Sequence, residues 1–279
     1  MDLSELQLDR ESARLFIPLK PDWCHGDQTL DDAATLIALA RMKENGRFLE
    51  IGTSAGEGAA ALLYGARDGT ATLTGVDLAK QVYYDKSRKV GDVVAEAVPH
   101  LAGRYTVITG AMSDRVLGME GSFDLIHIDA AHSHPWAVFD MLCALTRAEP
   151  GAIVAFHDAN YTAALSQAAY FFSRVFAGHG RFIGNHFAFE YRGPTPELVE
   201  AILRSLDLTW QAALPPKLLV ALHGPLHDVF SEADAMRIMA RLLERDGHYM
   251  SNVQIYTDIN KGLWHRELER RKLLAAQKG

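Results

Sequence analysis

Two short segments of the sequence carry side chains that can bind a metal ion or accept a proton. In the first segment Asp129 is followed three residues later by His132, and in the second His157 and Asp158 are adjacent. Carboxylates are ligands for hard divalent ions such as Mg²⁺, and a neutral imidazole can take a proton from a hydroxyl group near neutral pH. We therefore predict that Asp129, His157 and Asp158 bind a divalent metal ion and that His132 is a general base.

These residue types leave open whether a metal ion binds and which ion it is. An imidazole among the ligands shifts the preference from Mg²⁺ toward Mn²⁺, Fe²⁺ or Zn²⁺. The same residues also fit a structural interpretation, in which Asp129 and Asp158 cap helices and His132 is an ordinary loop residue. A reaction that uses His132 without a metal ion is the alternative to metal assistance.

A third segment is rich in glycine and follows a short apolar stretch. Gly52, Gly56 and Gly58 would let the backbone turn sharply and pass close to a ligand. This spacing alone also fits an ordinary tight turn or a dinucleotide site. Glu50, just before the first glycine, disfavours an anionic pyrophosphate, and Asp77 after the next apolar stretch could accept hydrogen bonds from ribose hydroxyls. Together they favour a cationic cofactor that contains a ribose.

This pattern resembles the class I S-adenosylmethionine-dependent methyltransferases, whose first motif is E-x-G-x-x-x-G and whose second strand ends in an acidic residue. The resemblance covers residues 27–192. It implies that the glycine segment surrounds the methionine part of S-adenosylmethionine, that Asp77 holds the ribose and that residues 110–113 flank the adenine. The implied cofactor-binding residues are Glu50, Gly52, Ser54, Gly56, Asp77, Ala111, Met112 and Asp129.

The two segments with histidine and aspartate are similar to those of metal-dependent O-methyltransferases of the catechol type and of the type that methylates sugars and other natural products. In these families an Asp ends the fourth strand, a basic residue follows three positions later, and an acidic pair or Asp-Asn ends the fifth strand. This chain departs from both patterns, because His157 replaces an acidic residue and Ala159 replaces the Asn, with Asn160 one position further on. The resemblance implies O-methylation of a small hydroxylated metabolite or natural product, with His132 as the base.

The elements that must position these residues alternate between short apolar strands and longer helical patterns. This alternation predicts an α/β fold with a doubly wound, mostly parallel sheet, in which polar residues gather at the carboxyl ends of the strands. Residues 181–192 are expected to form either a bent strand or a hairpin around Gly184 and Asn185. The five predicted parallel strands are 47–51, 71–76, 105–108, 123–128 and 152–156.

The sequence divides into three predicted parts. Residues 1–30 are an N-terminal segment near the active site, residues 31–194 are the core that binds S-adenosylmethionine, and residues 195–279 are a mainly helical extension. Pro215-Pro216 and Gly224-Pro225 are expected to interrupt the helices of this extension, which ends in a charged helix at 263–277. We expect the extension to be a lid or a dimerisation element, so a homodimer is among the expected states.

Composition narrows the classes of partner. With a net charge of −7 over 279 residues, the chain lacks the excess of Lys and Arg that nucleic-acid binding needs, so a small-molecule substrate is expected. No apolar run is long enough to span a membrane, and only two cysteines are present, which together predict a cytoplasmic protein. The alternatives are a metal-independent N- or O-methyltransferase, a nicotinamide-dependent oxidoreductase and a non-catalytic domain of the same fold.

Overall fold

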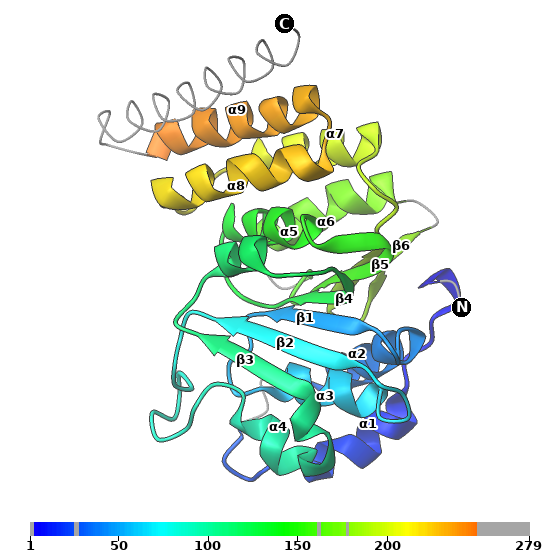
Figure 1. Cartoon of the computed structure of the whole chain (residues 1–279). Helices are drawn as coiled ribbons and strands as arrows, with labels where there is room; N and C mark the ends of the chain where they lie inside the picture. The colour runs from blue at the N-terminus through cyan, green and yellow to red at the C-terminus, as the bar shows by residue number, and fades with distance from the viewer. Residues whose placement is uncertain (1–2, 25–27, 161–162, 177–178, 250–279) are drawn as a thin grey trace, which may run out of the picture.

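A seven-stranded sheet with helices on both faces forms the centre of the molecule (Figure 1). The computed structural model describes residues 3–24, 28–160, 163–176 and 179–249. The strand order is β3-β2-β1-β4-β5-β7-β6; β1 to β5 are parallel, and β7 is antiparallel to both of its neighbours. The predicted doubly wound, mostly parallel sheet is confirmed. The strands are β1 (Arg47–Ile51), β2 (Thr72–Asp77), β3 (Tyr105–Thr109), β4 (Phe123–Ile128), β5 (Ala148–Phe156), β6 (Gly180–Ile183) and β7 (His186–Glu190).

The predicted bounds of β1 and β4 are correct, whereas β5 begins at Ala148, four residues before the predicted strand. The prediction treated Pro150-Gly151 as a turn that ends before the strand begins. The register with β4 shifts between the pairs Phe123–Ala148 and Leu125–Ile153, so β5 contains extra residues at this point. Pro150 and Gly151 therefore lie within an irregular part of the strand, where a proline and a positive φ are tolerated.

The segment expected to be a bent strand or a hairpin is a hairpin. Strands β6 and β7 pair in antiparallel register, with Ile183 opposite His186, so only Gly184 and Asn185 lie between them. Gly184 has a φ of 58°, which a two-residue turn of this kind requires. The hairpin places β7 next to β5 and extends the sheet beyond the parallel strands.

The first face of the sheet is covered by the N-terminal half of the chain. Thr29 and Asp32 form a capping box at the start of α2, because each side chain accepts a hydrogen bond from the backbone of the other residue. Leu3, Leu6 and Phe16 are buried on this face, so the N-terminal segment is part of the core. The helices here are α1 (Arg10–Phe16), α2 (Leu30–Met42), α3 (Glu57–Gly65) and α4 (Asp92–Ala97), with 3₁₀ helices at Leu3–Glu5, Ile17–Leu19 and Pro99–Arg104.

The second face carries the remaining helices, and those of the C-terminal extension stack outside α5 and α6 (Figure 1). Leu198, Trp210 and Leu222 of this extension are buried in one cluster with residues of β4 and β5. The helices are α5 (Trp136–Leu145), α6 (Ala163–Val175), α7 (Pro196–Leu206), α8 (Pro216–Val229) and α9 (Glu232–Tyr249), with a 3₁₀ helix at Ser113–Gly118. None of the helices in the described residues is long and apolar enough to cross a membrane.

The predicted helix break at Gly224-Pro225 is wrong, because α8 continues through both residues. Pro225 removes one backbone hydrogen bond from the helix. Leu222 and Leu226 on either side of it are fully buried, and this burial stabilises the helix against that loss. The other predicted break is confirmed, since α8 begins at Pro216. The predicted charged helix at 263–277 lies outside the described residues.

Candidate functional site

A cavity of about 870 Å³ opens at the carboxyl ends of β1, β2, β4 and β5, where the sequence analysis expected the site. A volume of this size is at the upper end of the range for sites that hold small molecules or cofactors. Helix α5 and the 110–113 loop form one wall, and the ends of β4 and β5 form another. The predicted site residues that line it are Gly52, Ser54, Asp77, Ala111, Met112, Asp129, His132, His157 and Asp158.

The glycine segment passes directly against the end of β4. Gly52 has a φ of 87°, and a Cβ atom placed on it would lie 2.1 Å from the carbonyl oxygen of Asp129. Only glycine fits this backbone conformation and this close approach. Gly56, which has a φ of 99°, is the N-cap of α3 and does not line the cavity. The segment therefore brings its backbone to the cavity at Gly52 and Ser54.

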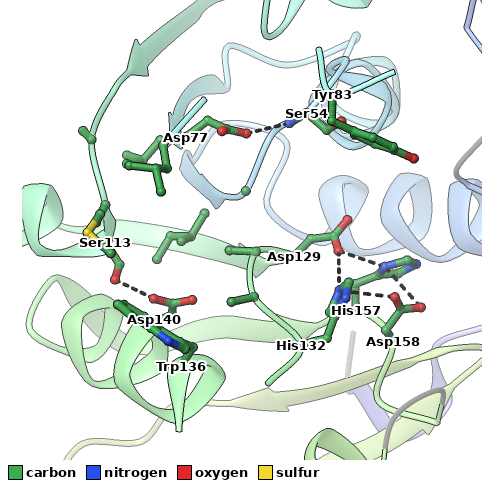
Figure 2. A pocket seen from close by; sticks show the side chains of 18 of the residues that line it. Ser54, Asp77, Tyr83, Ser113, Asp129, His132, Trp136, Asp140, His157 and Asp158 are labelled. Carbon is green, nitrogen blue, oxygen red and sulfur yellow. Dashed lines mark hydrogen bonds and ion pairs between the residues drawn. The ribbon is translucent and has the colours of Figure 1, made fainter. Parts of the chain in front are cut away.

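Asp77 connects the end of β2 to the glycine segment. Its Oδ2 accepts hydrogen bonds from the backbone N–H groups of Thr53 and Ser54 at 2.9 and 2.8 Å, and its Oδ1 accepts one from Ala79 at 2.7 Å. Figure 2 shows the bond between Asp77 and Ser54 at the edge of the cavity. The carboxylate thus fixes the shape of the loop, and the predicted contact with a ribose stays a prediction.

Glu50 does not line the cavity, which corrects the expectation that it contacts a cationic cofactor directly. Its side chain is 1% exposed, and its Oε1 lies 3.2 Å from Nδ1 of His127. Burial raises the pKa of Glu50, although His127 opposes the shift. Successive side chains of a strand point to opposite faces, and here Ile51 rather than Glu50 points into the cavity.

The two segments with histidine and aspartate meet at the ends of β4 and β5, as predicted for adjacent parallel strands. His132 Nε2 lies 3.2 Å from Asp158 Oδ2 and 3.5 Å from Asp129 Oδ1, and His157 Nδ1 lies 3.0 Å from the same Asp129 oxygen. Figure 2 shows these four side chains pointing toward one another. Two carboxylates and two imidazoles therefore form one connected cluster on the cavity wall.

The cluster shifts the pKa values of Asp129, His132 and His157 toward their charged forms. Burial opposes ionisation of Asp129, but the hydrogen bonds from His132 and His157 outweigh it and lower the pKa of Asp129. The hydrogen bond to Asp129 raises the pKa of His132. Burial likewise opposes the proton on His157, but Asp129 and Asp32 outweigh it and raise the pKa of His157 to about 10. Positive and negative charges thus compensate each other within the cluster.

The donor set fits a divalent cation. Asp129, His132 and Asp158 each offer one ligand atom, and these atoms lie within 4.8 Å of one another. Two carboxylate oxygens and one imidazole nitrogen suit ions between Mg²⁺ and the later transition metals. The predicted ligand His157 is not part of this group of ligand atoms, and its Nδ1 lies 3.0 Å from Asp129 Oδ1 and 3.6 Å from Asp158 Oδ1.

Asn185 is a site residue that the sequence analysis did not assign to the site. Its side-chain amide donates a hydrogen bond to Asp158 Oδ1 from the turn of the β6–β7 hairpin. Asp158 has a φ of 53°, which is uncommon for a residue other than glycine, and this hydrogen bond helps to hold it there. The resemblance drew attention to Asn160 instead, which is exposed and donates to the carbonyl of Gly184 at 3.0 Å.

Asp140 is a second such residue, and it lies on the opposite wall of the cavity. It is 3% exposed on α5 and accepts a hydrogen bond of 2.5 Å from Ser113 Oγ. Burial raises the pKa of Asp140 to about 7, although the Ser113 hydrogen bond opposes the shift. Trp136 of the same helix also lines the cavity, as Figure 2 shows. An aspartate within an otherwise apolar helix was the signal that could have identified it.

Residues 49–159 match a family of proteins described as a methyltransferase domain. The matched region runs from β1 to the residues after β5, so it contains the glycine segment, Asp77 and the cluster at the ends of β4 and β5. No curated protein matches the chain. The family match confirms that this part of the chain is a methyltransferase domain, the class that the sequence pattern predicted.

Three of the solved structures to which the chain is similar are methyltransferases. An S-adenosylhomocysteine-bound methyltransferase from Podospora anserina is 22% identical, with 53% of this chain and 60% of that chain covered and a TM-score of 0.39. The O-methyltransferase TomG from Streptomyces achromogenes, in complex with S-adenosylmethionine, is 18% identical, with 67% and 93% covered and a TM-score of 0.45. An O-methyltransferase from Bacillus cereus, in complex with S-adenosylhomocysteine, is 16% identical, with 64% and 90% covered and a TM-score of 0.44.

Proposed function

We propose that this class I S-adenosylmethionine-dependent methyltransferase transfers a methyl group to a hydroxyl oxygen of a small molecule. One observation carries the proposal: His132 lies between two carboxylates on the wall of the same cavity that the glycine segment and Asp77 line. The cofactor would occupy the end of the cavity near Gly52, Ser54 and Asp77. The acceptor would then lie at the other end, with its hydroxyl group next to His132.

The reaction needs an acceptor oxygen that has lost its proton, because a neutral alcohol or phenol is a weak nucleophile. In the proposed step the oxygen forms a bond to the methyl carbon, and the bond between that carbon and the sulfonium sulfur breaks. S-adenosylhomocysteine leaves, and the hydroxyl proton passes to Nε2 of His132. Asp129 and Asp158 stabilise the imidazolium that forms. Most of the rate enhancement would come from holding the two reactants in line.

A divalent cation held by Asp129 and Asp158 would lower the pKa of a hydroxyl group that binds to it. In the metal-assisted version the two carboxylates alone would hold the cation, so that Nε2 of His132 still accepts the hydroxyl proton. The proposal therefore includes a metal-assisted and a metal-independent version. Methylation of an amine is the second candidate function. It would depend less on His132 as a base, because many amines attack the methyl carbon in their neutral form.

The experiment is a product assay with S-adenosylmethionine and a panel of catechols, phenols, polyols and amines, analysed by mass spectrometry. We expect O-methylated products from the wild type, and we expect His132→Ala to lower kcat by about 10²- to 10⁴-fold. His100→Ala is the matched control, because His100 is exposed and lies outside the cavity. Full activity of H132A on a hydroxyl acceptor, or products methylated only at nitrogen, would exclude the proposal. Dialysis against EDTA separates its two versions.

A further inference from the structure

A second group of metal-ligating side chains lies behind the cavity wall, on the side of His157 that faces away from Asp129. We propose that Asp32, His157 and His186 together bind a transition-metal ion such as Zn²⁺, Co²⁺ or Fe²⁺. This site is distinct from the Asp129, His132 and Asp158 group, and it does not depend on the proposed methyl acceptor.

The three side chains converge from three separate elements. Asp32 Oδ1 lies 3.5 Å from His157 Nε2 and 3.8 Å from His186 Nδ1, and all three ligand atoms are within 4.8 Å of one another. Ligand atoms around a tetrahedral zinc ion are roughly 3.3 to 3.5 Å apart, given metal–ligand bonds of about 2.0 to 2.1 Å. The two distances from Asp32 Oδ1 are therefore close to what an ion at the centre would need.

Within the described residues, none of these three ligand atoms makes a hydrogen bond of ordinary geometry, and the nearest contact is the 3.5 Å ion pair between Asp32 Oδ1 and His157 Nε2. Asp32 is 2% exposed, His157 is 6% exposed and His186 is fully buried. His186 gives the strongest evidence for a bound ion, because neither of its ring nitrogens makes a hydrogen bond within the described residues. Buried polar groups are nearly always satisfied, and an unsatisfied one points to an absent ion or water. One metal ion would satisfy Asp32 Oδ1, His157 Nε2 and His186 Nδ1 at once.

The fold holds the ligands on rigid elements. Asp32 lies in the first turn of α2, where its Oδ2 accepts hydrogen bonds from Thr29 N and Oγ1 at 2.9 and 2.7 Å, which leaves Oδ1 for a ligand. His157 and His186 face each other because β5 and β7 pair Phe156 with Phe187, and the next residues follow in that register. Sites of this kind need few adjustments when the ion binds.

The donor set selects the class of ion. Two imidazole nitrogens and one carboxylate oxygen suit Zn²⁺, Co²⁺ and Fe²⁺, whereas Mg²⁺ prefers an all-oxygen set. Neither ring nitrogen of His186 makes a hydrogen bond within the described residues, so Nδ1 can bind a metal ion. On binding, the ion would take the place of a proton on His157 Nε2, and that proton would be released.

The site would also position Asp129. A metal ion on Nε2 of His157 fixes the hydrogen on Nδ1, and Nδ1 lies 3.0 Å from Asp129 Oδ1. Metal-bound histidines commonly orient a carboxylate through their second nitrogen in this way. His157 is thus a positioning residue that connects the buried ion to the cavity. Without an ion, a protonated His157 between Asp32 and Asp129 would make the same contacts, and this is the competing explanation.

The test measures metal binding by the metal-free full chain. We expect the wild type to bind Zn²⁺ or Co²⁺, with a visible Co²⁺ absorption spectrum, and His186→Gln to weaken this binding by about 100-fold. His186 does not line the cavity, so S-adenosylhomocysteine binding by H186Q serves to show that the variant is folded. Asp158→Asn is the matched control, because Asp158 offers no ligand atom to the Asp32, His157 and His186 group and contacts His157 only on the Nδ1 side, at 3.6 Å, so the tight ion should be retained.

Equal binding by H186Q and the wild type would overturn the proposal, as would loss of the tight ion in D158N alone. A second measurement covers the case in which H186Q fails to fold. Crystals of the wild type grown with Co²⁺ should show an anomalous-scattering peak between Asp32, His157 and His186. Electron density for a water at that position, without an anomalous signal, would assign the site to solvent and exclude the metal ion.

Discussion

His132 and His157 both contact Asp129 and both line the cavity, but the two side chains differ in exposure. The side chain of His132 is 39% exposed, whereas that of His157 is 7% exposed and lies between Asp129 and Asp32. A general base must reach the proton that it removes, so exposure favours His132 for this role. His157 is suited instead to fixing the position of Asp129.

Asp140 allows a prediction about pH and stability. The pKa of Asp140 is about 7 in the folded chain, whereas the ordinary value for an aspartate is 3.8. At a pH between these two values, the folded state keeps a proton that the unfolded state loses. The contribution of this proton to the free energy of unfolding is complete below about pH 4, and it is lost as the pH rises through about 7. The wild type should lose on the order of 2 to 4 kcal/mol relative to Asp140→Asn between about pH 4.5 and 8.

Urea unfolding of both chains at the two pH values measures this difference. All other titrating groups are common to both chains, so they cancel when the two free energies of unfolding are subtracted. A difference that does not change with pH would show that Asp140 is not the protonated group.

At the scale of single residues, the sequence best predicted the positions of site residues that directly follow a strand. Asp129, His132, His157 and Asp158 were expected to meet because adjacent parallel strands end at the same edge, and they do. Glu50 was misplaced, since its spacing from the glycines does not reveal which face of the strand it occupies. Asn185 lies at the site because it is in the turn of the antiparallel β6–β7 hairpin. The sequence did not decide between a hairpin and a bent strand for this segment.

At the scale of elements, the close approach of the glycine segment to β4 gives a second prediction. Gly52→Ala would place a Cβ atom 2.1 Å from the backbone of Asp129 at a φ that alanine rarely adopts, so the strand end or the loop must move. We expect a loss of about 3 kcal/mol in the free energy of unfolding and weaker binding of S-adenosylhomocysteine.

Gly103→Ala is the matched control for Gly52→Ala. Gly103 lies in the 3₁₀ helix Pro99–Arg104, and a Cβ atom there would meet nothing within 4 Å. Its replacement should change the free energy of unfolding by less than about 1 kcal/mol. If both alanine variants behave like the wild type in urea unfolding, the loop does not require glycine at position 52.

Elements with strong apolar runs were predicted well, whereas two of the expected breaks at glycine and proline do not occur. β1 and β4 have the predicted bounds because both are mostly buried and are apolar apart from Arg47, Glu50, Asp124 and His127. In contrast, Pro150-Gly151 lies inside β5 and Gly224-Pro225 lies inside α8. In both places burial of neighbouring residues outweighs the local preference for a turn, and only tertiary packing reveals this.

At the scale of the whole molecule, the helices of the C-terminal extension share one hydrophobic core with the sheet. The loop before α8 also reaches the loop after β4, where Gln211 N donates to the carbonyl of His134 at 2.7 Å. We therefore expect residues 195–249 to unfold together with the sheet. The predicted roles as a lid or a dimerisation element, and the predicted cytoplasmic location, stay predictions.

Leu222→Ala tests this cooperation, because Leu222 is fully buried in the shared core. We expect a loss of about 2 to 5 kcal/mol in the free energy of unfolding, in a single transition that circular dichroism and fluorescence report identically. Leu15→Ala, at a side chain that is 63% exposed, should have little effect. Two separate transitions, with only the first shifted by L222A, would mean that the extension is an independent unit.

The division of the cavity into a cofactor end and an acceptor end can be measured without knowing the acceptor. The measurement is calorimetric titration of S-adenosylhomocysteine into the wild type, Asp77→Ala and His132→Ala, with NADH as the competing ligand. We predict saturable binding to the wild type, affinity weaker by about tenfold or more in D77A, affinity within about threefold of the wild type in H132A, and no binding of NADH. Binding of NADH without binding of S-adenosylhomocysteine, or equal loss of affinity in D77A and H132A, would contradict this account.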